Sequence, residues 1–166
     1  DNYHQNRSSY QNNKKSTINN LEELLIQSVN EQMISDVPIG AFLSGGIDSS
    51  LITAIMQSLS DKPINTFSIG FVNKDYDESL YSNRIAKYLR TNHHEKIIGP
   101  KDCLDIIPKL SQIYDEPFGD SSSMPTYLLS KLAKESVTVS LSGDGADELF
   151  GGYERYYRGM AYWRIL

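Results

Sequence analysis

The run 43–50 (Leu-Ser-Gly-Gly-Ile-Asp-Ser-Ser) constrains the fold of this 166-residue chain more than any other feature, because it joins a predicted strand to a predicted helix. The apolar segment 39–43 precedes the two glycines, and a helical pattern follows from residue 51. Adjacent glycines let backbone N–H groups approach a ligand closely, and the N-terminus of a helix adds partial positive charge. A strand, a glycine loop and a helix in this order therefore predict an anion-binding cradle.

The side chains of this loop indicate that the anion is a phosphate accompanied by a metal ion. Ser44, Ser49 and Ser50 carry hydroxyl donors for phosphate oxygens, and Asp48 is a candidate ligand for the metal. The common NTPase loop, Gly-x-x-x-x-Gly-Lys-Ser/Thr, is excluded because Gly46 stands at the lysine position. No Gly-x-Gly-x-x-Gly dinucleotide motif occurs in the chain. The loop therefore favours pyrophosphate with a metal ion over a γ-phosphate held by lysine.

Predicted strands and helices alternate along the chain. The strands are expected at 39–43, 64–71, 93–98 and 137–141, and the helices at 18–29, 49–59, 78–89, 101–114 and 125–135. The helix at 101–114 is expected to be broken softly at Pro108. The first helix has apolar residues three and four apart, and Asn19 or Asn20 is its candidate cap. This alternation predicts an α/β fold with a parallel, doubly wound sheet and right-handed crossovers. Ligands of such sheets bind outside the carboxyl ends of the strands.

A second glycine-rich loop, 142–147 (Ser-Gly-Asp-Gly-Ala-Asp), follows the last predicted strand. If the strands before the two loops are neighbours, Asp48 and Asp147 face one pocket and form a candidate Mg²⁺ pair for the pyrophosphate of ATP. The alternative is that each aspartate only caps a helix.

Four motifs in this order resemble the ATP-pyrophosphatase (PP-loop) superfamily, and within it the synthetase domain of glutamine-hydrolysing asparagine synthetase and its relatives. They are 36–40 (Asp-Val-Pro-Ile-Gly) with its Ser-Gly-Gly-x-Asp-Ser loop, 66–71 (Thr-Phe-Ser-Ile-Gly-Phe), 115–118 (Asp-Glu-Pro-Phe) and 142–153 (Ser-Gly-Asp-Gly-Ala-Asp-Glu-Leu-Phe-Gly-Gly-Tyr). The resemblance covers roughly residues 16–160. It implies a Rossmann-like fold of the adenine nucleotide alpha hydrolase type.

The resemblance also implies a role for individual residues. A backbone group of Ile69 would read the edge of the adenine and Leu43 would add another backbone contact, whereas Ser142 and Gly143 would touch the ribose or α-phosphate side. The metal would lie on Asp48 and Asp147. The expected ATP-binding residues are Leu43, Ser44, Gly45, Gly46, Asp48, Ser49, Ser50, Ile69, Ser142 and Gly143.

Asp144 is the candidate catalytic residue, and it departs from the family pattern. Many asparagine synthetases carry glutamate at the matching place, in Ser-Gly-Glu-Gly, where it contacts the substrate region or orients the reactive groups. Aspartate keeps the charge but is one methylene shorter. This difference leaves the acceptor acid open.

The reaction implied by the resemblance is adenylation of the side-chain carboxylate of aspartate by ATP, with release of pyrophosphate. Ammonia from glutamine, delivered by an N-terminal glutaminase domain that this chain lacks, then gives asparagine and AMP. One alternative is a related amidotransferase or ring-closing synthetase that acts on another carboxylic acid. A second alternative is a nucleotide-binding module without chemistry. We expect the full-length protein to be a homodimer.

Composition limits the other classes of function. A net charge of −5 argues against a nucleic-acid-binding surface, and the single Cys103 excludes an internal disulfide. The chain contains neither an apolar run of about 18 residues nor a signal-peptide core, so we expect no membrane partner and a cytoplasmic enzyme. We expect 1–15 to be a linker from a missing N-terminal domain, and 16–166 to be the N-terminal part of the synthetase domain, truncated at its C-terminus and inactive alone.

Two further segments have open roles. His93 and His94 lie next to each other in a predicted strand and should face opposite sides of the sheet, which favours a structural role over shared binding of one ion. In the segment 115–122, Pro117 and Gly119 shape a loop, and Asp120 and Ser121 are candidate caps of the next helix, but a carboxylate there could also meet a substrate amine.

Overall fold

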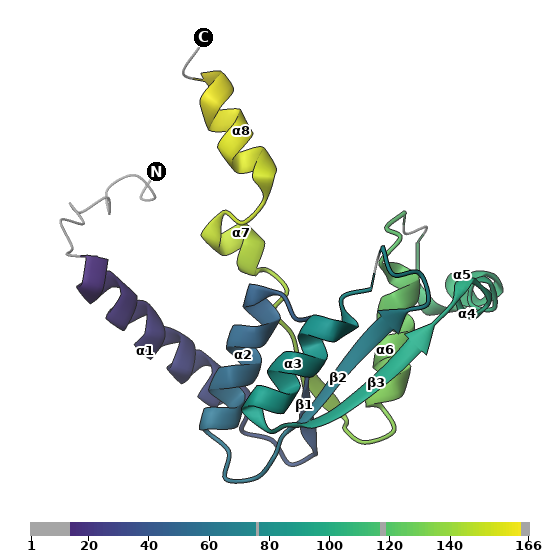
Figure 1. Cartoon of the computed structure of the whole chain (residues 1–166), viewed down its shortest axis with the longest axis horizontal. Helices are drawn as coiled ribbons and strands as arrows, with labels where there is room; N and C mark the ends of the chain where they lie inside the picture. The colour runs from purple at the N-terminus through teal and green to yellow at the C-terminus, as the bar shows by residue number, and fades with distance from the viewer. Residues whose placement is uncertain (1–13, 76, 117–118, 164–166) are drawn as a thin grey trace.

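The computed structural model describes residues 14–75, 77–116 and 119–163 (Figure 1). Its elements, in chain order, are α1 (Lys14–Gln32), β1 (Ile39–Phe42), α2 (Ile47–Ser58), β2 (Asn65–Phe71), α3 (Ser79–Leu89), β3 (Asn92–Ile98), α4 (Pro100–Leu104), the 3₁₀ helix η2 (Ile107–Lys109), α5 (Leu110–Ile113), α6 (Ser123–Ala133), β4 (Val139–Leu141), α7 (Ala146–Phe150) and α8 (Glu154–Trp163). None of the helices in this part of the chain has the length and apolar character needed to cross a membrane.

The four strands form one parallel sheet in the order β3-β2-β1-β4. The chain adds β2 and then β3 on one side of β1, and returns to place β4 on the other side. Ala41 of β1 therefore pairs with Thr66 of β2 and with Leu141 of β4. The predicted doubly wound α/β fold is confirmed, and its topological switch point lies between β1 and β4.

Helices cover both faces of the sheet (Figure 1). On one face, Ala41 packs with Val29 of α1 and with Ile55 and Met56 of α2. On the other face, Phe67 packs against Ala133 at the end of α6. Alternate residues of the strands face these two layers, which is why the central strands are apolar along most of their length.

The two adjacent histidines of β3 face opposite layers, as expected. The ring nitrogens of His93 lie 2.9 Å from Thr66 Oγ1 and 3.1 Å from Ser68 Oγ, two hydroxyls of β2. The ring of His94 stacks on Phe67 with centroids 5.1 Å apart. Both histidines thus tie β3 to β2.

Burial lowers the pKa of His93, and His94 lowers it further. An unfolded histidine has a pKa of about 6.5, so below that pH the unfolded chain takes up a proton that folded His93 resists. The contribution of His93 to the free energy of unfolding is therefore fully present above about pH 6.5. It is lost as the pH falls through the lower pKa that His93 has in the folded state. The free energy of unfolding should fall when the pH is lowered from 7.5 to 5.5, and we expect this fall to be smaller in His93→Gln than in the wild type, measured by urea denaturation. An unchanged pH dependence would contradict this assignment.

Two local predictions were wrong. The helix expected at 101–114 with only a soft break at Pro108 is instead divided into α4, η2 and α5, with Pro108 inside the 3₁₀ turn. Proline lacks the N–H group that a continuing helix needs, so the break is larger than expected. The predicted caps Asn19 and Asn20 lie within α1, which begins at Lys14 and so includes the last two residues of the expected linker 1–15. Residues 1–13 lie outside the described residues.

Candidate functional site

The candidate site lies at the carboxyl ends of β1 and β4, where both glycine-rich loops begin. These strands are neighbours, so the condition for bringing Asp48 and Asp147 to one crevice is met. The backbone N–H of Leu43 donates to Phe67 O at 2.9 Å and anchors the first loop to β2. The switch point of a doubly wound sheet is where such folds bind their ligands.

The first loop needs glycine at position 45 for two reasons. Gly45 has φ +92°, a backbone conformation that residues with side chains rarely adopt. A Cβ built on it would also lie 2.7 Å from Tyr81 Cβ and 2.8 Å from Ser82 N. The first turn of α3 therefore presses against the loop and helps to shape it. Motif spacing alone gives no signal of this contact.

The serine hydroxyls of the loop are bonded within the loop itself. Ser44 Oγ lies 2.8 Å from Ser49 Oγ, and the backbone N–H of Ser44 donates to Ser49 Oγ at 3.2 Å. The hydroxyls of Ser49 and Ser50 both donate to the carbonyl of Gly46. To donate to a phosphate oxygen, a serine hydroxyl of this loop would therefore have to break its present hydrogen bond within the loop. In the structure as it stands, the serines hold the loop's shape.

Neither aspartate is the N-cap of its helix. Gly46 caps α2 and Gly145 caps α7, and neither cap has a side chain that bonds the first turn. Asp48 and Asp147 instead lie inside the first turns, where a carboxylate is favoured by the helix dipole. Because no side chain occupies the N-cap of α2, the first N–H groups of this 12-residue helix remain suited to an anion.

The second loop packs directly on the first. A Cβ built on Gly143 would lie 2.7 Å from Ser49 N and 2.9 Å from the carbonyl carbon of Asp48. The neighbouring Ser142 donates through Oγ to Asp144 Oδ2 at 3.0 Å, and Asp144 is exposed. The structure thus brings Ser142, Gly143 and Asp144 beside the first turn of α2.

The carboxylates fit a magnesium ion by the chemistry of their donor atoms. Magnesium prefers hard oxygen ligands and is usually bound by one or two carboxylates, with phosphate oxygens and waters completing its shell. Asp48 and Asp147 lie in the first turns of α2 and α7, the helices that follow the adjacent strands β1 and β4, which suits such a pair. Within the described residues, no group of three or more His, Cys, Asp or Glu side chains forms a metal site. A site here would therefore depend on the nucleotide for its remaining oxygens.

Ile69 lies in β2, two residues beyond Phe67, which is the last residue of β2 paired with β1. Phe67 directs its carbonyl toward Leu43, so the backbone groups of Ile69, two residues further, face the same edge. These backbone groups are the ones that the sequence predicts to read the edge of the adenine.

In the segment 115–122, Asp120 makes a structural contact, but the N-cap of α6 is Ser122 and not the expected Asp120 or Ser121. Asp120 Oδ1 accepts a hydrogen bond from the backbone N–H of Ser122 at 2.8 Å, just before α6, and this bond is the main cause of the lowered pKa of Asp120. The expected contribution of Pro117 to the loop lies outside the described residues.

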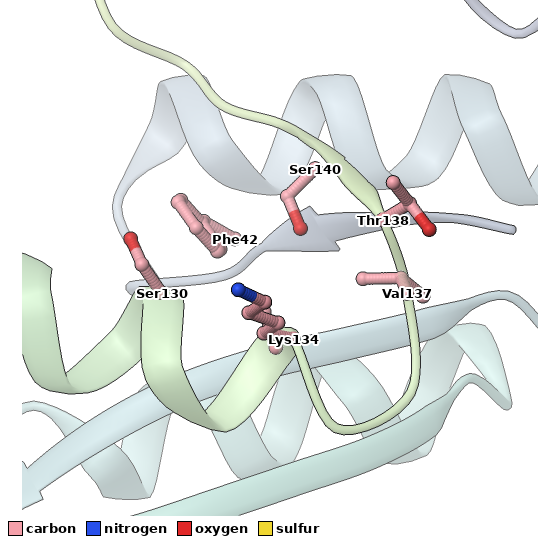
Figure 2. A pocket seen from close by; sticks show the side chains of 7 residues that line it. Phe42, Ser130, Lys134, Val137, Thr138 and Ser140 are labelled. Carbon is pink, nitrogen blue, oxygen red and sulfur yellow. The ribbon is translucent and has the colours of Figure 1, made fainter. Parts of the chain in front are cut away.

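A separate cavity of about 540 Å³ lies on the α6 side of the sheet (Figure 2). Figure 2 shows Lys134, which follows α6, and Ser140 of β4 reaching into it from opposite sides, next to Phe42. Ser140 Oγ is buried and has no hydrogen-bond partner among the described residues. None of the glycine-loop residues lines this cavity, so it is distinct from the candidate site at the carboxyl ends of β1 and β4.

Comparison with known proteins decides the family. Residues 20–166 match the family model described as asparagine synthase. The chain belongs to the asparagine synthase family. The predicted relationship is therefore confirmed over most of the chain.

Several asparagine synthase relatives are similar to this chain. A putative glutamine-hydrolysing asparagine synthetase 2 from Methanocaldococcus jannaschii is 48% identical over 147 residues, which are 88% of this chain and 28% of that protein. Glutamine-hydrolysing asparagine synthetase 1 from Bacillus subtilis is 40% identical over 139 residues, which are 84% of this chain and 22% of that protein. The chain thus spans about a quarter of the length of these relatives.

A solved structure supports the fold. An NH₃-dependent NAD synthetase from Campylobacter jejuni, in complex with the nitrate ion, superposes with a TM-score of 0.54 at 18% identity. The match covers 81% of this chain and 60% of that chain. At this identity the similarity establishes the α/β architecture alone.

Proposed function

We propose that this chain is part of an ATP-dependent ligase that activates the side-chain carboxylate of aspartate as an acyl-adenylate and converts it to asparagine. The observation that carries the proposal is the contact of Gly143 with the backbone of Asp48 and Ser49, which unites the two glycine loops in one crevice. Membership of the asparagine synthase family supplies the type of reaction.

In this proposal, the crevice holds ATP along its length. The β- and γ-phosphates lie on the first N–H groups of α2 and on the loop 44–50 (Ser-Gly-Gly-Ile-Asp-Ser-Ser). The backbone of Ile69, with that of Leu43, reads the adenine edge. Ser142 and Gly143 approach the ribose and α-phosphate.

Asp48 and Asp147 would hold Mg²⁺, which when bound would offset the negative charge of the pyrophosphate. The two carboxylates raise the local negative charge, so without the ion they would oppose binding of the phosphates. Their placement in the first turns of two helices partly offsets that repulsion.

The proposed chemistry has two steps. A carboxylate oxygen of aspartate attacks the α-phosphorus, the bond to the bridging oxygen breaks, and pyrophosphate leaves with charge stabilised by the fixed N–H donors of the loop. Ammonia then attacks the acyl carbon, loses a proton, and expels AMP. Asp144, exposed at the crevice and bonded to Ser142, is the proposed group that orients the acid. We also propose that a glutaminase domain supplies the ammonia, and that the full-length protein is a cytoplasmic homodimer.

A second function has a specific observation in its favour. Asp144 stands where many asparagine synthetases have glutamate, and the shorter side chain suits a different acceptor distance. A related amidotransferase or ring-closing synthetase that activates another carboxylic acid would keep the same crevice.

ATP–pyrophosphate exchange on the full-length protein tests these proposals. Exchange that requires aspartate, in a panel of carboxylic acids, is the expected result. Exchange with another acid alone would keep the adenylation step and change the substrate. If no acid supports exchange in an assay that works for a control ligase, the chain is better described as a nucleotide-binding module.

A further inference from the structure

We infer that Gly152 is a positioning residue for Asp147, because the missing side chain at 152 leaves the space that the Asp147 carboxylate occupies. This inference rests on the function proposed above, which gives that carboxylate the task of binding Mg²⁺.

The turn after α7 folds back onto the start of that helix. Gly151 ends α7 with φ +69°, and the backbone N–H of Gly152 donates to Asp147 O at 3.0 Å. This bond returns the chain to the level of Asp147 within five residues. Gly152 is therefore fixed beside Asp147 by the backbone.

A second contact fixes the same turn from the side of Tyr153. The Tyr153 hydroxyl donates to Glu148 Oε1 at 2.5 Å, and the Arg155 guanidinium lies 4.2 Å from the Tyr153 ring centroid. Glu148 is the neighbour of Asp147 in α7. Residues 152 and 153 are thus bonded to residues 147 and 148, one by the backbone and one by side chains.

The backbone conformation does not require glycine at 152. Among the described residues, the glycines with positive φ are 45, 145 and 151, and 152 is not among them. A Cβ built on Gly152 would instead overlap Asp147 Oδ1, and would lie 3.0 Å from Asp147 Cγ and 3.3 Å from Asp147 Cα. The requirement for glycine at 152 therefore comes from the Asp147 side chain.

The two glycines of the turn consequently have different tasks. Gly151 supplies a conformation, and a Cβ there would meet only Tyr156 Cδ2 at 3.9 Å. Gly152 supplies space. A Cβ at 152 can be accommodated if the Asp147 carboxylate rotates away, because that carboxylate is the free end of a flexible side chain. A substitution at 152 should therefore preserve the fold and displace the proposed metal ligand.

The test uses the full-length protein with Mn²⁺ as the probe and inorganic pyrophosphate present. We expect Gly152→Ala to weaken the Mn²⁺ affinity measured by electron paramagnetic resonance by about 10-fold or more, and to raise by a similar factor the Mg²⁺ concentration that half-saturates exchange. The melting temperature should stay close to that of the wild type. Gly159→Ala is the matched control, because nothing lies within 4 Å of a Cβ at 159.

A double-mutant cycle decides whether Gly152 acts through Asp147. In the Asp147→Asn background, Gly152→Ala should cause no further loss of Mn²⁺ affinity. Equal and independent losses in both backgrounds would overturn the inference. If Gly152→Ala does not fold, adding Asp147→Ala removes the carboxylate that the new Cβ would overlap, so the double variant should fold, and its failure to fold would also overturn the inference.

The outcomes separate the inference from the proposed function. If the wild type shows no exchange with any acid, the proposed function is wrong and the inference falls with it. If the wild type shows Mg²⁺-dependent exchange and Gly152→Ala has the same metal dependence, the function stands and only the role of Gly152 is wrong.

Discussion

Asp48→Asn in the full-length protein is expected to lower Mg²⁺-dependent ATP–pyrophosphate exchange by about 100-fold or more. Asparagine has nearly the same shape as aspartate but no charge, so the loop should keep its conformation. The loss of even an outer hydrogen bond to a metal ligand costs 10- to 100-fold in affinity, and the loss of a ligand's charge should cost at least that much.

The same variant should have the opposite effect when no metal is present. Asp48 lies in the first turn of α2, beside the N–H groups proposed to hold phosphate. Without a metal ion its negative charge repels pyrophosphate, so Asp48→Asn should bind pyrophosphate in EDTA as tightly as the wild type or more tightly.

Calorimetric titration of pyrophosphate, with Mg²⁺ and with EDTA, measures both effects. Asp61→Asn, an exposed acid between α2 and β2, is the control and should leave both titrations unchanged. Equal weakening with and without Mg²⁺ would show that Asp48 acts by holding the loop and not by binding metal.

The fold was largely predictable because the local signals agreed with one another. Strands of continuous apolar character and helices of regular period alternate along the chain, and the two glycine loops mark the ends of β1 and β4. The break at Pro108 was underestimated, since how far a proline disrupts a helix depends on the packing around it. The start of α1 was also missed, because Lys14 and Lys15 carry no apolar pattern.

The site was predictable only in part. Sequence supplied both loops and both aspartates, but whether they meet depends on the strand order, which the motifs do not contain. The alternative of Asp48 and Asp147 as simple helix caps could be set aside only when glycine was found at both N-cap positions. The pair Gly151-Gly152 was visible in the last motif, yet its purpose required the position of the Asp147 carboxylate.

Contacts between distant segments explain what the sequence left out. Gly45 must be glycine partly because α3, more than thirty residues further along the chain, packs on it through Tyr81 and Ser82. The serine hydroxyls were expected to face phosphate, and the structure shows them bonded inside the loop. A hydroxyl's choice between partners depends on the folded geometry, which composition does not determine.

Gly143→Ala should separate the two loops, because the added Cβ would meet backbone atoms that cannot rotate away. The nearest are Ser49 N at 2.7 Å and the carbonyl carbon of Asp48 at 2.9 Å. Gly143 does not have a positive φ, so the effect of the substitution reports the contact and not a strained backbone. Overpacking of this kind costs about 1–3 kcal/mol of unfolding free energy.

The larger expected effect of Gly143→Ala is on ATP binding. Moving the second loop away from α2 would draw Ser142 and Gly143 from the proposed ribose and α-phosphate contacts and would widen the gap between Asp48 and Asp147. ATP affinity of the full-length protein in the presence of Mg²⁺ should fall by about 10-fold or more, equivalent to about 1.4 kcal/mol. Gly159→Ala in α8 should leave both affinity and stability near wild type, because a Cβ there meets no atom within 4 Å. Wild-type ATP affinity in Gly143→Ala would mean that contact between the loops is not needed for nucleotide binding, and would remove the observation on which the proposed function depends.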